Sequence, residues 1–578
     1  MTLSSALNIA ASGMRATQTA ISTTSNNIAN ADVDGYTRKT VSPQTVVVSG
    51  VGAGVSLSEI QRQVDAGLER RTNAARSESS LVAIVSDYLS QLTSAIGSTT
   101  GDDTIASAIG NLTSSLQSLS VSPNSASEAQ SVVSNLTDLA TSANSLTDSI
   151  QDLRADADRA IADSVDTVNA SLARLDELND QVLRAAAAGA STADLVDAQM
   201  QEIAILSEQL NISYYTDSNG AISVYGPGGT VLLNDDVHEL DYSTTASIDS
   251  NDTLANGSLS GISVGGKDIT SFISGGTIGG LLEVRDEILP AQQESVDLLV
   301  DQLVAAANDA QNAGTSVPAP NALTSSAAVE GTAALNGSGT LRIAVLGDDG
   351  SVQSYTDLDL SSYTTVDDLV AAMDAIGGVS ATIGSDGKLT VSADDSAMGI
   401  GLAQVSGGIG SDNVSVSSAF GLNDLLIKDS SGHLSLREDI SSDPSLLARS
   451  SLSTDAALAV GDAGIVTGDN SAVAAMLSAF TTDRNFAATG DLGAVSGSLS
   501  DYASEIISHI AVLSENAEAS AEIKANALSN LSGSLANASG VNLDEEAAEL
   551  EILQTNYQAA ANVISVIQEM YDTLLNMV

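Results

Sequence analysis

The chain has 578 residues, a length that suggests three to four domains at roughly 150 residues each. It carries 20 Lys and Arg against 73 Asp and Glu, and the resulting net charge of −53 disfavours binding to nucleic acid or to an anionic membrane surface. The absence of Cys excludes disulfides, thiolate metal sites and Cys nucleophiles, while 43% hydrophobic residues favour packed domains over disorder.

Targeting segments are not evident. No apolar run approaches the roughly 18 residues that cross a membrane. Residues 1–31 lack the basic start and continuous apolar run of a cleaved signal peptide. We therefore expect no membrane insertion and no cleaved signal.

The N-terminal segment predicts an amphipathic helix, because apolar or small side chains recur at alternating steps of four and three. The stripe consists of Leu3, Leu7, Ala10, Met14, Thr17, Ile21, Thr24 and Ile28.

The C-terminal segment repeats this pattern more strongly. Its stripe consists of Leu550, Leu553, Tyr557, Ala560, Ile564, Ile567, Tyr571, Leu574 and Val578, and a second stripe beside it consists of Ile552, Ala559, Val563, Val566, Met570 and Met577. Asn542 as N-cap with Glu545 three residues on predicts a capping box, and Asp544, Glu545 and Glu546 suit the positive end of the helix dipole.

Single helices of this kind are marginal in water, so the two terminal helices are expected to pack on one another or on other subunits. Helices like these are most often members of an intramolecular bundle. The second stripe, and the nearly acid-free N-terminus opposite an acidic C-terminus, favour a coiled-coil pair that also forms a polymer.

Between the termini the predicted secondary structure alternates several times between helix and strand. Helix is expected over residues 57–211 with a break at Gly189, a β excursion over 213–278, helix over 280–313 interrupted at Pro290, and a linker over 314–335. Strand alternation fills 341–436, with hairpin turns at 348–350, 385–387 and 431–432 and a short helix near 366–376, and helix returns after Pro444 and dominates 502–535.

The expected fold class is α+β multidomain, with paired terminal heptad helices, a long-helix bundle and an inserted β-rich outer domain. The domains are residues 1–56 plus 536–578 for the axial coiled coil, 57–314 plus 443–535 for the helical domain with its β excursion, and 315–442 for the outer domain with its linker.

Catalytic patterns fail on inspection. Gly261 to Gly265 fits the spacing of a serine nucleophile elbow around Ser263, but a strand-like piece follows where a helix is needed, and His238, His433 and His509 lie on different expected elements. A phosphate-loop reading of Gly261 to Lys267 fails because Asp268 stands where Ser or Thr must bind magnesium. We expect a hairpin turn there, and no catalytic, cofactor or metal site.

Motifs near both ends carry a specific resemblance. Leu7 to Met14, Ser25 to Ala31 and Gly35 to Arg38 resemble the N-terminal signature of flagellar rod, hook and junction proteins, although Asp34 stands where Pro is usual. Ser539 to Glu546 and the segment around Tyr557, with inner pieces at 279–286, 420–425 and 468–470, resemble the FlgK family of hook-associated proteins. The matching motif residues are Asn26, Asn27, Asn30, Gly35, Tyr36, Arg38, Asn542, Asp544 and Glu545.

The resemblance implies a structural protein that joins hook to filament. It implies export through the flagellar type III channel, self-assembly in a helical layer, and an extracellular place in the flagellum. Implied partners are further copies of the chain, hook protein, a second junction protein, and an export chaperone on the segment from about residue 543. A loop packed at subunit contacts, or aiding export, is the implied role of the Asn26 to Tyr36 group, whose plain alternative is a helix end followed by a turn. Two other functions stay open: another axial protein of hook or flagellin type, and a secreted serine hydrolase.

Overall fold

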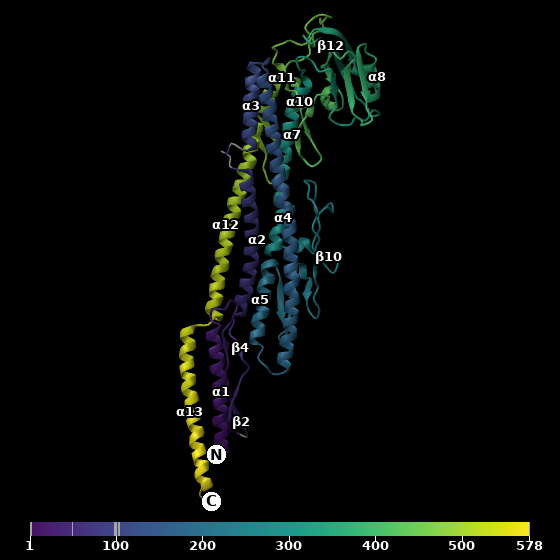
Figure 1. The fold of residues 1–578 in the computed structure, drawn as a ribbon. Helices are drawn as coiled ribbons and strands as arrows, with labels where there is room; N and C mark the ends of the chain where they lie inside the picture. The colour runs from purple at the N-terminus through teal and green to yellow at the C-terminus, as the bar shows by residue number, and fades with distance from the viewer. Residues whose placement is uncertain (1–2, 49, 98–100, 102–103, 577–578) are drawn as a thin grey trace.

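The computed structural model describes residues 3–48, 50–97, 101 and 104–576. The molecule is elongated, with both termini at one end, a shaft of long helices in the middle and a β-rich domain at the other end (Figure 1). The fold class expected from the sequence, long helices combined with a β-rich part, is confirmed.

The terminal end is built from two helices and a hairpin. Helix α1 spans Leu3–Ala29, and helix α13 spans Leu543–Asn576 and lies beside α1. Strands β2 (Pro43–Val48) and β3 (Val51–Leu57) form an antiparallel hairpin, with β3 against α1. Short strands β1 (Lys39–Thr40) and β4 (Gln61–Arg62) pair above it.

The shaft contains the long helices of the chain, and its shared core consists mainly of aliphatic side chains. The helices are α2 (Ala66–Ile96), α3 (Ile105–Val121), α4 (Ala126–Ala187), α5 (Ala193–Gln209), α6 (Gly276–Glu283), α7 (Leu289–Ala313), α11 (Ser471–Thr481) and α12 (Leu499–Ser539). Within the helix predicted over 57–211, the apolar residues from Leu136 to Val182 lie along one 62-residue helix, α4, and most of them are buried.

The shaft part of the chain also contains short strands. They are β5 (Ser213–Thr216), β6 (Ile222–Tyr225), β7 (Val231–Leu233), β8 (Leu240–Asp241), β9 (Ser263–Val264), β10 (Lys267–Asp268), β19 (Arg484–Phe486) and β20 (Val495–Gly497). A turn at 217–220 joins β5 to β6, within the region where the sequence predicts a β excursion. A π-helical turn over Val284–Ile288 separates α6 from α7, so the predicted interruption next to Pro290 is confirmed.

The outer domain packs small antiparallel sheets and a helix around its own core. Its strands are β11 (Ala322–Thr324), β12 (Ser338–Leu346), β13 (Val352–Asp359), β14 (Val379–Ile383), β15 (Leu389–Ala393) and β16 (Gly399–Gly408), with helices α8 (Val366–Asp374) and α9 (Val416–Phe420). The predicted turns at 348–350 and 385–387 and the predicted short helix are confirmed.

Three expectations need correction. Helix α2 begins at Ala66 and not at residue 57, because the Asp65 carboxylate caps it by accepting from the backbone N–H of Gly67 (2.9 Å) and Leu68 (3.0 Å). The hairpin β2–β3 was not expected. The segment 314–335 is not a free linker, because β11 pairs with β15 in the outer domain.

The predicted borders of the outer domain at 315 and 442 also differ from the packing. The antiparallel hairpin of β17 (Leu426–Lys428) and β18 (Leu434–Leu436) packs on α7 and α4 of the shaft. Helix α10 (Glu438–Ser442) follows this hairpin in the chain. Conversely, Leu452, Leu458 and Ile465 pack on β12 and β13. The chain therefore leaves the outer domain and returns to it.

Candidate functional site

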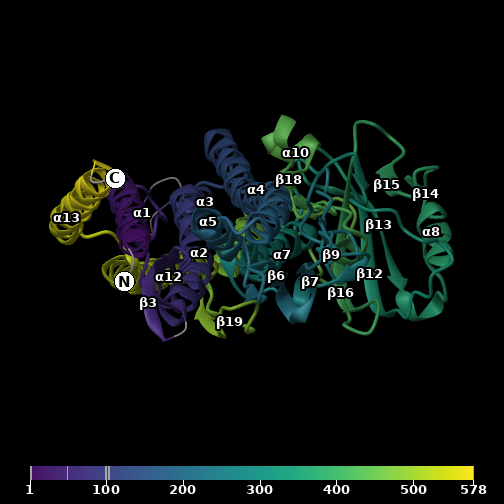
Figure 2. The ribbon, with the colours of Figure 1, turned by 90° about the horizontal axis from the view of Figure 1, so that it is seen from below.

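The paired terminal helices carry the predicted assembly residues, and Figure 2 shows α13 on the outer side of α1. Ile567 is buried, and the remaining seam positions that the pair covers are half-buried: Leu3, Leu7, Ala10, Met14, Ile21, Ile28, Leu550, Leu553, Ala560, Ile564 and Tyr571. Tyr557 and Leu574 are exposed, and Val578 lies outside the described residues. The structure thus brings the two seams together within one chain; their part in assembly stays a prediction.

The second stripe of α13 faces solvent. Ile552, Val563, Val566 and Met570 are 55%, 49%, 54% and 47% exposed, and Ala559 between them is exposed as well. Large apolar side chains lined up on one exposed helix face mark an interaction surface. We call these five residues the outer stripe.

The helix pair has almost no core of its own. Within the described parts of α1 and α13, the buried apolar side chains are Ala16 and Ile567. The other buried side chains, Thr23, Thr24, Asn27 and Glu546, are polar and lie toward the shaft. The pair is therefore held most firmly where it meets the shaft, at what we call the joint.

Asn27 is the centre of the joint. Its side-chain nitrogen donates to the Lys39 carbonyl and to Glu546 Oε2, both at 2.9 Å. Its side-chain oxygen accepts from the Lys39 backbone N–H at 3.0 Å and from the Tyr36 hydroxyl at 2.9 Å. These bonds use both donors and both lone pairs of the amide, so one buried residue ties α1 to the following loop and to α13.

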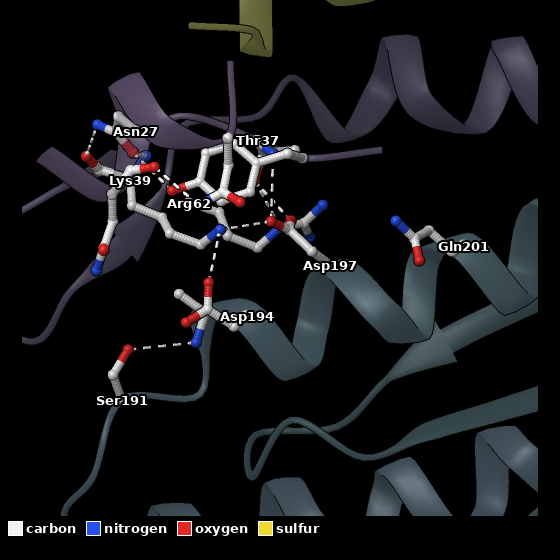
Figure 3. Close-up of polar contacts among 12 residues, drawn as sticks. Asn27, Thr37, Lys39, Arg62, Ser191, Asp194, Asp197 and Gln201 are labelled. Carbon is white, nitrogen blue, oxygen red and sulfur yellow. Dashed lines mark hydrogen bonds and ion pairs between the residues drawn. The ribbon is translucent and has the colours of Figure 1, made fainter. Parts of the chain in front are cut away.

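Asp197 on α5 makes the second connection (Figure 3). Its carboxylate accepts from the Thr37 hydroxyl at 2.6 Å, from Lys39 Nζ at 2.7 Å and from Arg62 Nε at 2.6 Å. Lys39 Nζ also lies 2.8 Å from Asp194. Burial alone lowers the pKa of Lys39, but the hydrogen bonds to Asp194 and Asp197 outweigh burial and raise its pKa above the ordinary value. The charged form of Lys39 is therefore the one built into the joint.

Arg38 fastens the turn between α12 and α13. Its Nε lies 2.7 Å from Glu546 Oε1 and its Nη1 lies 3.1 Å from Glu545 Oε2. Its backbone N–H donates to the Ser539 carbonyl at 2.7 Å. Because Glu546 is only 2% exposed, this charge is compensated by Arg38 and Asn27 and not by water.

The structure gives physical roles to most of the predicted motif residues. Asn27, Tyr36, Arg38 and Glu545 converge at the joint. The Asn30 side chain donates to the Asn26 carbonyl at 2.9 Å and closes the end of α1, which agrees with the plain helix-end reading for that pair.

The two remaining motif positions are set by backbone demands. Gly35 has φ of 74°, and a Cβ there would lie 2.6 Å from Gln201 Nε2, so the loop approaches α5 at a point that favours glycine. Asn542 caps α13 by accepting from the backbone N–H of Asp544 at 3.0 Å, as predicted. The Glu545 side chain, which the predicted capping box would direct back to Asn542, instead accepts from Arg38 among the described hydrogen bonds. Asp544 is exposed.

The sequence did not predict Lys39, Arg62 or Asp197 as part of the joint, and it did not predict that Glu546 contacts Asn27 and Arg38. Asp194 and Asp197 share one helix face at a spacing of three, and Lys39 follows the motif directly, but these signals do not show that the segments meet. Only the fold brings positions 27, 197 and 546 together.

The inner motif pieces stabilise the shaft. Arg285 is fully buried, with Nη1 at 2.9 Å from Asp158 Oδ1 and a bidentate pair to Asp286 at 2.8 Å. Asn423 donates to the Gln311 carbonyl at 2.8 Å, and Asn470 donates to the Ser120 carbonyl at 2.7 Å. These residues join segments far apart in sequence and form no solvent-facing site.

Ser263 lies in β9, and Gly265 and Gly266, with φ of 57° and 78°, make the tight turn to β10. The predicted hairpin turn is confirmed, and a nucleophile elbow would need a helix after the turn. Within the described residues, His433 bonds Asp148 and no histidine contacts Ser263 by a hydrogen bond.

Two kinds of site are absent from the described part of the chain. None of its helices is long and apolar enough to span a membrane. No grouping of three or more His, Cys, Asp or Glu side chains suited to a metal ion occurs in it.

Family comparisons match three parts of the chain. The flagellar hook-associated protein FlgK helical domain matches residues 89–321, in the shaft. The flagella basal body rod protein family matches residues 7–37, which include most of α1 and the loop through Tyr36. The C-terminal family of the basal body rod proteins FlgEFG matches residues 531–577.

Relatives agree with these matches. Flagellar hook-associated protein 1 of Escherichia coli is 25% identical over 322 residues, covering 54% of this chain and 58% of that protein. Its counterpart in Salmonella typhimurium is 24% identical over 319 residues, covering 54% and 56%. The alignments thus span somewhat more than half the length of these curated relatives.

A solved structure shares the fold. The flagellar hook junction protein FlgK from Burkholderia pseudomallei aligns with a TM-score of 0.51 and 16% identity, over 80% of this chain and 99% of that one. Matches to the shaft and to both ends, two named relatives and a common fold all point the same way: the chain is similar to the FlgK family of flagellar hook-associated proteins.

Proposed function

We propose that the chain is a structural subunit of the bacterial flagellum, and not an enzyme, which joins hook to filament by assembling in a helical layer through its terminal helices. The observation that carries this proposal is the state of α13 in the single chain. Its seam is half-covered by α1, while its outer stripe stays exposed although all five of its residues are apolar. The exposed apolar face of such a helix is covered when neighbouring subunits pack on it.

The shape of the molecule supports a layered arrangement. In the proposed layer the α1–α13 pair forms a coiled coil on the inside, the shaft surrounds it, and the outer domain points away from the axis. The terminal pair and the outer domain lie at opposite ends of the shaft (Figure 1). We retain the sequence-based division into axial, helical and outer domains as part of this proposal, with the borders of the outer domain changed as the packing requires.

The proposed partners are further copies of the chain, hook protein and a second junction protein. The proposed location is the extracellular hook–filament junction, reached through the flagellar export channel without a cleaved signal peptide. Before export, the segment from residue 543 onward binds a chaperone. Its exposed apolar stripe supports this proposal, because an amphipathic helix is a common form of recognition.

Co-sedimentation with isolated hooks tests the proposed function. Full-length protein is expected to pellet with hooks, whereas a variant lacking residues 1–32 and 542–578 is expected to remain in the supernatant. Circular dichroism of the truncated variant controls for folding, since the shaft core does not include the deleted residues. Equal pelleting of the two proteins would place the hook contact elsewhere and contradict the proposal.

The chaperone proposal has its own test. A pull-down with the flagellar export chaperone is expected to capture the full chain and to lose it when residues 543–578 are deleted. Capture of the deleted variant would contradict the proposed chaperone site without affecting the hook result.

A further inference from the structure

The hairpin β2–β3 is the least charged exposed structure at the terminal end. Residues 43–57 contain no Asp, Glu, Lys or Arg, in a chain whose net charge is −53. Val47, Val48 and Val51 near its tip are 59%, 59% and 60% exposed. An exposed apolar strand of this kind is an unusual liability for a single chain, and natural proteins usually protect such an edge with charge.

The hairpin is held in a fixed place. Strand β3 packs on α1, where Ser12 Oγ accepts from the Val55 backbone N–H at 3.1 Å. A Cβ at Gly54 would lie 2.4 Å from Ser12 Oγ, so the backbone of β3 touches the helix there. Strand β2 is the outer strand, with β3 as its partner among the described strands. The valines are therefore presented to solvent on a rigid base.

A second unpartnered apolar surface lies on the same end of the molecule. The outer stripe of α13 runs from Ile552 to Met570, beside the seam that meets α1. The helix α1 lies between the two surfaces, since it contacts α13 with one part of its circumference and β3 with another (Figure 2). Within one chain the hairpin and the outer stripe cannot cover each other.

Charge restricts where two copies can touch. Two chains of charge −53 repel one another, so a stable contact forms where carboxylates are sparse. The hairpin has none, and the outer stripe is apolar and unbroken from Ala559 to Met570. A contact between two different surfaces is heterologous, which leaves one free surface of each kind at the ends and lets further copies add.

We propose that the β2–β3 hairpin of one copy packs its valines against the outer stripe of α13 in a neighbouring copy. This inference rests on the proposed function, which requires assembly through the terminal end, and it adds the pair of surfaces that meet.

The absence of cysteine from the chain allows a direct crosslinking test. Two full-length variants are prepared, Val47→Cys and Val563→Cys, and they are assembled on isolated hooks separately and as an equal mixture. A short bismaleimide crosslinker is then added. The expected result is a crosslinked dimer in the mixture and no dimer with either variant alone, because the contact joins a hairpin to a stripe.

The matched control is Ser565→Cys, an exposed position two residues from Val563 on another face of α13. Mixed with Val47→Cys, it is expected to give no dimer. A dimer from Val47→Cys alone would show a hairpin-to-hairpin contact and overturn the inference. Normal pelleting with hooks without a mixed dimer would also overturn it while leaving the proposed function intact. Failure of unmodified protein to pellet would instead remove the proposed function on which the inference depends.

Discussion

Glu546 connects the terminal pair to the rest of the molecule through a single buried charge. It receives Arg38 Nε at 2.7 Å and Asn27 Nδ2 at 2.9 Å, and these two residues hold the loop and the end of α1. Removing one partner of such a pair leaves the other desolvated. The attachment of α13 therefore depends on this carboxylate more than on any contact along the half-buried seam.

Glu546→Gln is expected to loosen α13 by about 1–3 kcal/mol, because the amide cannot reproduce the charge-assisted bond to Arg38. Hydrogen exchange followed by mass spectrometry would show faster exchange in α1 and α13, with the shaft unchanged. Glu549→Gln, at an exposed position of the same helix, is the control. Equal protection in the two variants would contradict the role given to Glu546.

His433 makes a pH-dependent contact on the shaft. Its Nε2 lies 2.8 Å from Asp148 on α4, and this hydrogen bond raises the pKa of His433 above its ordinary value, with smaller contributions from Asp429 and Asp249. A raised folded-state pKa means that the stabilisation is complete below the unfolded pKa of about 6.5 and is lost as pH rises through the folded value.

The β17–β18 hairpin is therefore expected to exchange its amides faster, relative to the shaft, at pH values above the folded pKa than below it. NMR titration of the three histidines gives the pKa directly, and Asp148→Asn is expected to return His433 toward its ordinary value. An unchanged His433 titration in that variant would contradict the assignment.

At the scale of elements, the space around a helical glycine shows how closely its helix approaches a neighbouring helix. A Cβ at Gly280 on α6 would lie 2.6 Å from the Leu81 carbonyl oxygen on α2, whereas a Cβ at Gly533 on α12 would meet nothing within 4 Å. The same substitution at these two helical positions therefore has opposite expected signs.

Gly280→Ala is expected to lower stability by about 1–3 kcal/mol through overpacking, and Gly533→Ala is expected to raise it by about 0.5–1 kcal/mol through helix propensity. Thermal unfolding followed by circular dichroism at the helix wavelength measures both. A stabilising Gly280→Ala would mean that α6 and α2 can separate at little cost.

The elements differ in how far the sequence could predict them. The apolar stripe of α4 keeps steps of three and four along the helix with one shift of register near Ile161, and the turns at 217–220 and 385–387 have their usual residues, so periodicity and turn chemistry suffice there. The start of α2 was predicted too early, because Leu57, Ile60 and Val64 have helical spacing although this stretch is strand and loop. The β2–β3 hairpin at 43–57 was not predicted. The sequence does not predict strand β11, because its Ala, Ser and Asn neighbours have the composition of a loop.

The joint could be predicted only in part, for a different physical reason. Asn27, Tyr36, Arg38 and Glu545 belong to a recognisable motif, but their partners Lys39, Asp197 and Glu546 are defined by contacts across as many as 519 positions. The conformational preferences of neighbouring residues cannot predict contacts between residues so far apart in the sequence. The outer stripe, in contrast, was visible as helical periodicity, and its exposure in the single chain is what the structure adds.

At the scale of the whole molecule, two effects oppose each other. The negative charge of the chain repels other copies, whereas the hairpin and the outer stripe favour their association. The screening length falls from about 30 Å at 0.01 M salt to about 8 Å at 0.15 M, so repulsion between copies of charge −53 weakens across this range. Self-association of the chain is therefore expected to increase with salt.

Sedimentation velocity over that salt range checks the expectation, and Val563→Asp serves as the comparison because it adds charge to the outer stripe. The variant is expected to stay monomeric where the unmodified chain associates. Association that weakens with rising salt would indicate ionic contacts between copies.

The 62 residues of α4 correspond to a rod of about 90 Å, which runs from the end of the shaft beside α5 to the outer domain. Such a rod acts as a lever arm whose fulcrum is the joint at Asn27, Asp197 and Glu546. A tilt of about 5° at the fulcrum displaces the far end of a rod of that length by about 8 Å. Small angular differences between neighbouring subunits, as on the inside and outside of a curved tube, would thus become large changes in the spacing of the outer domains.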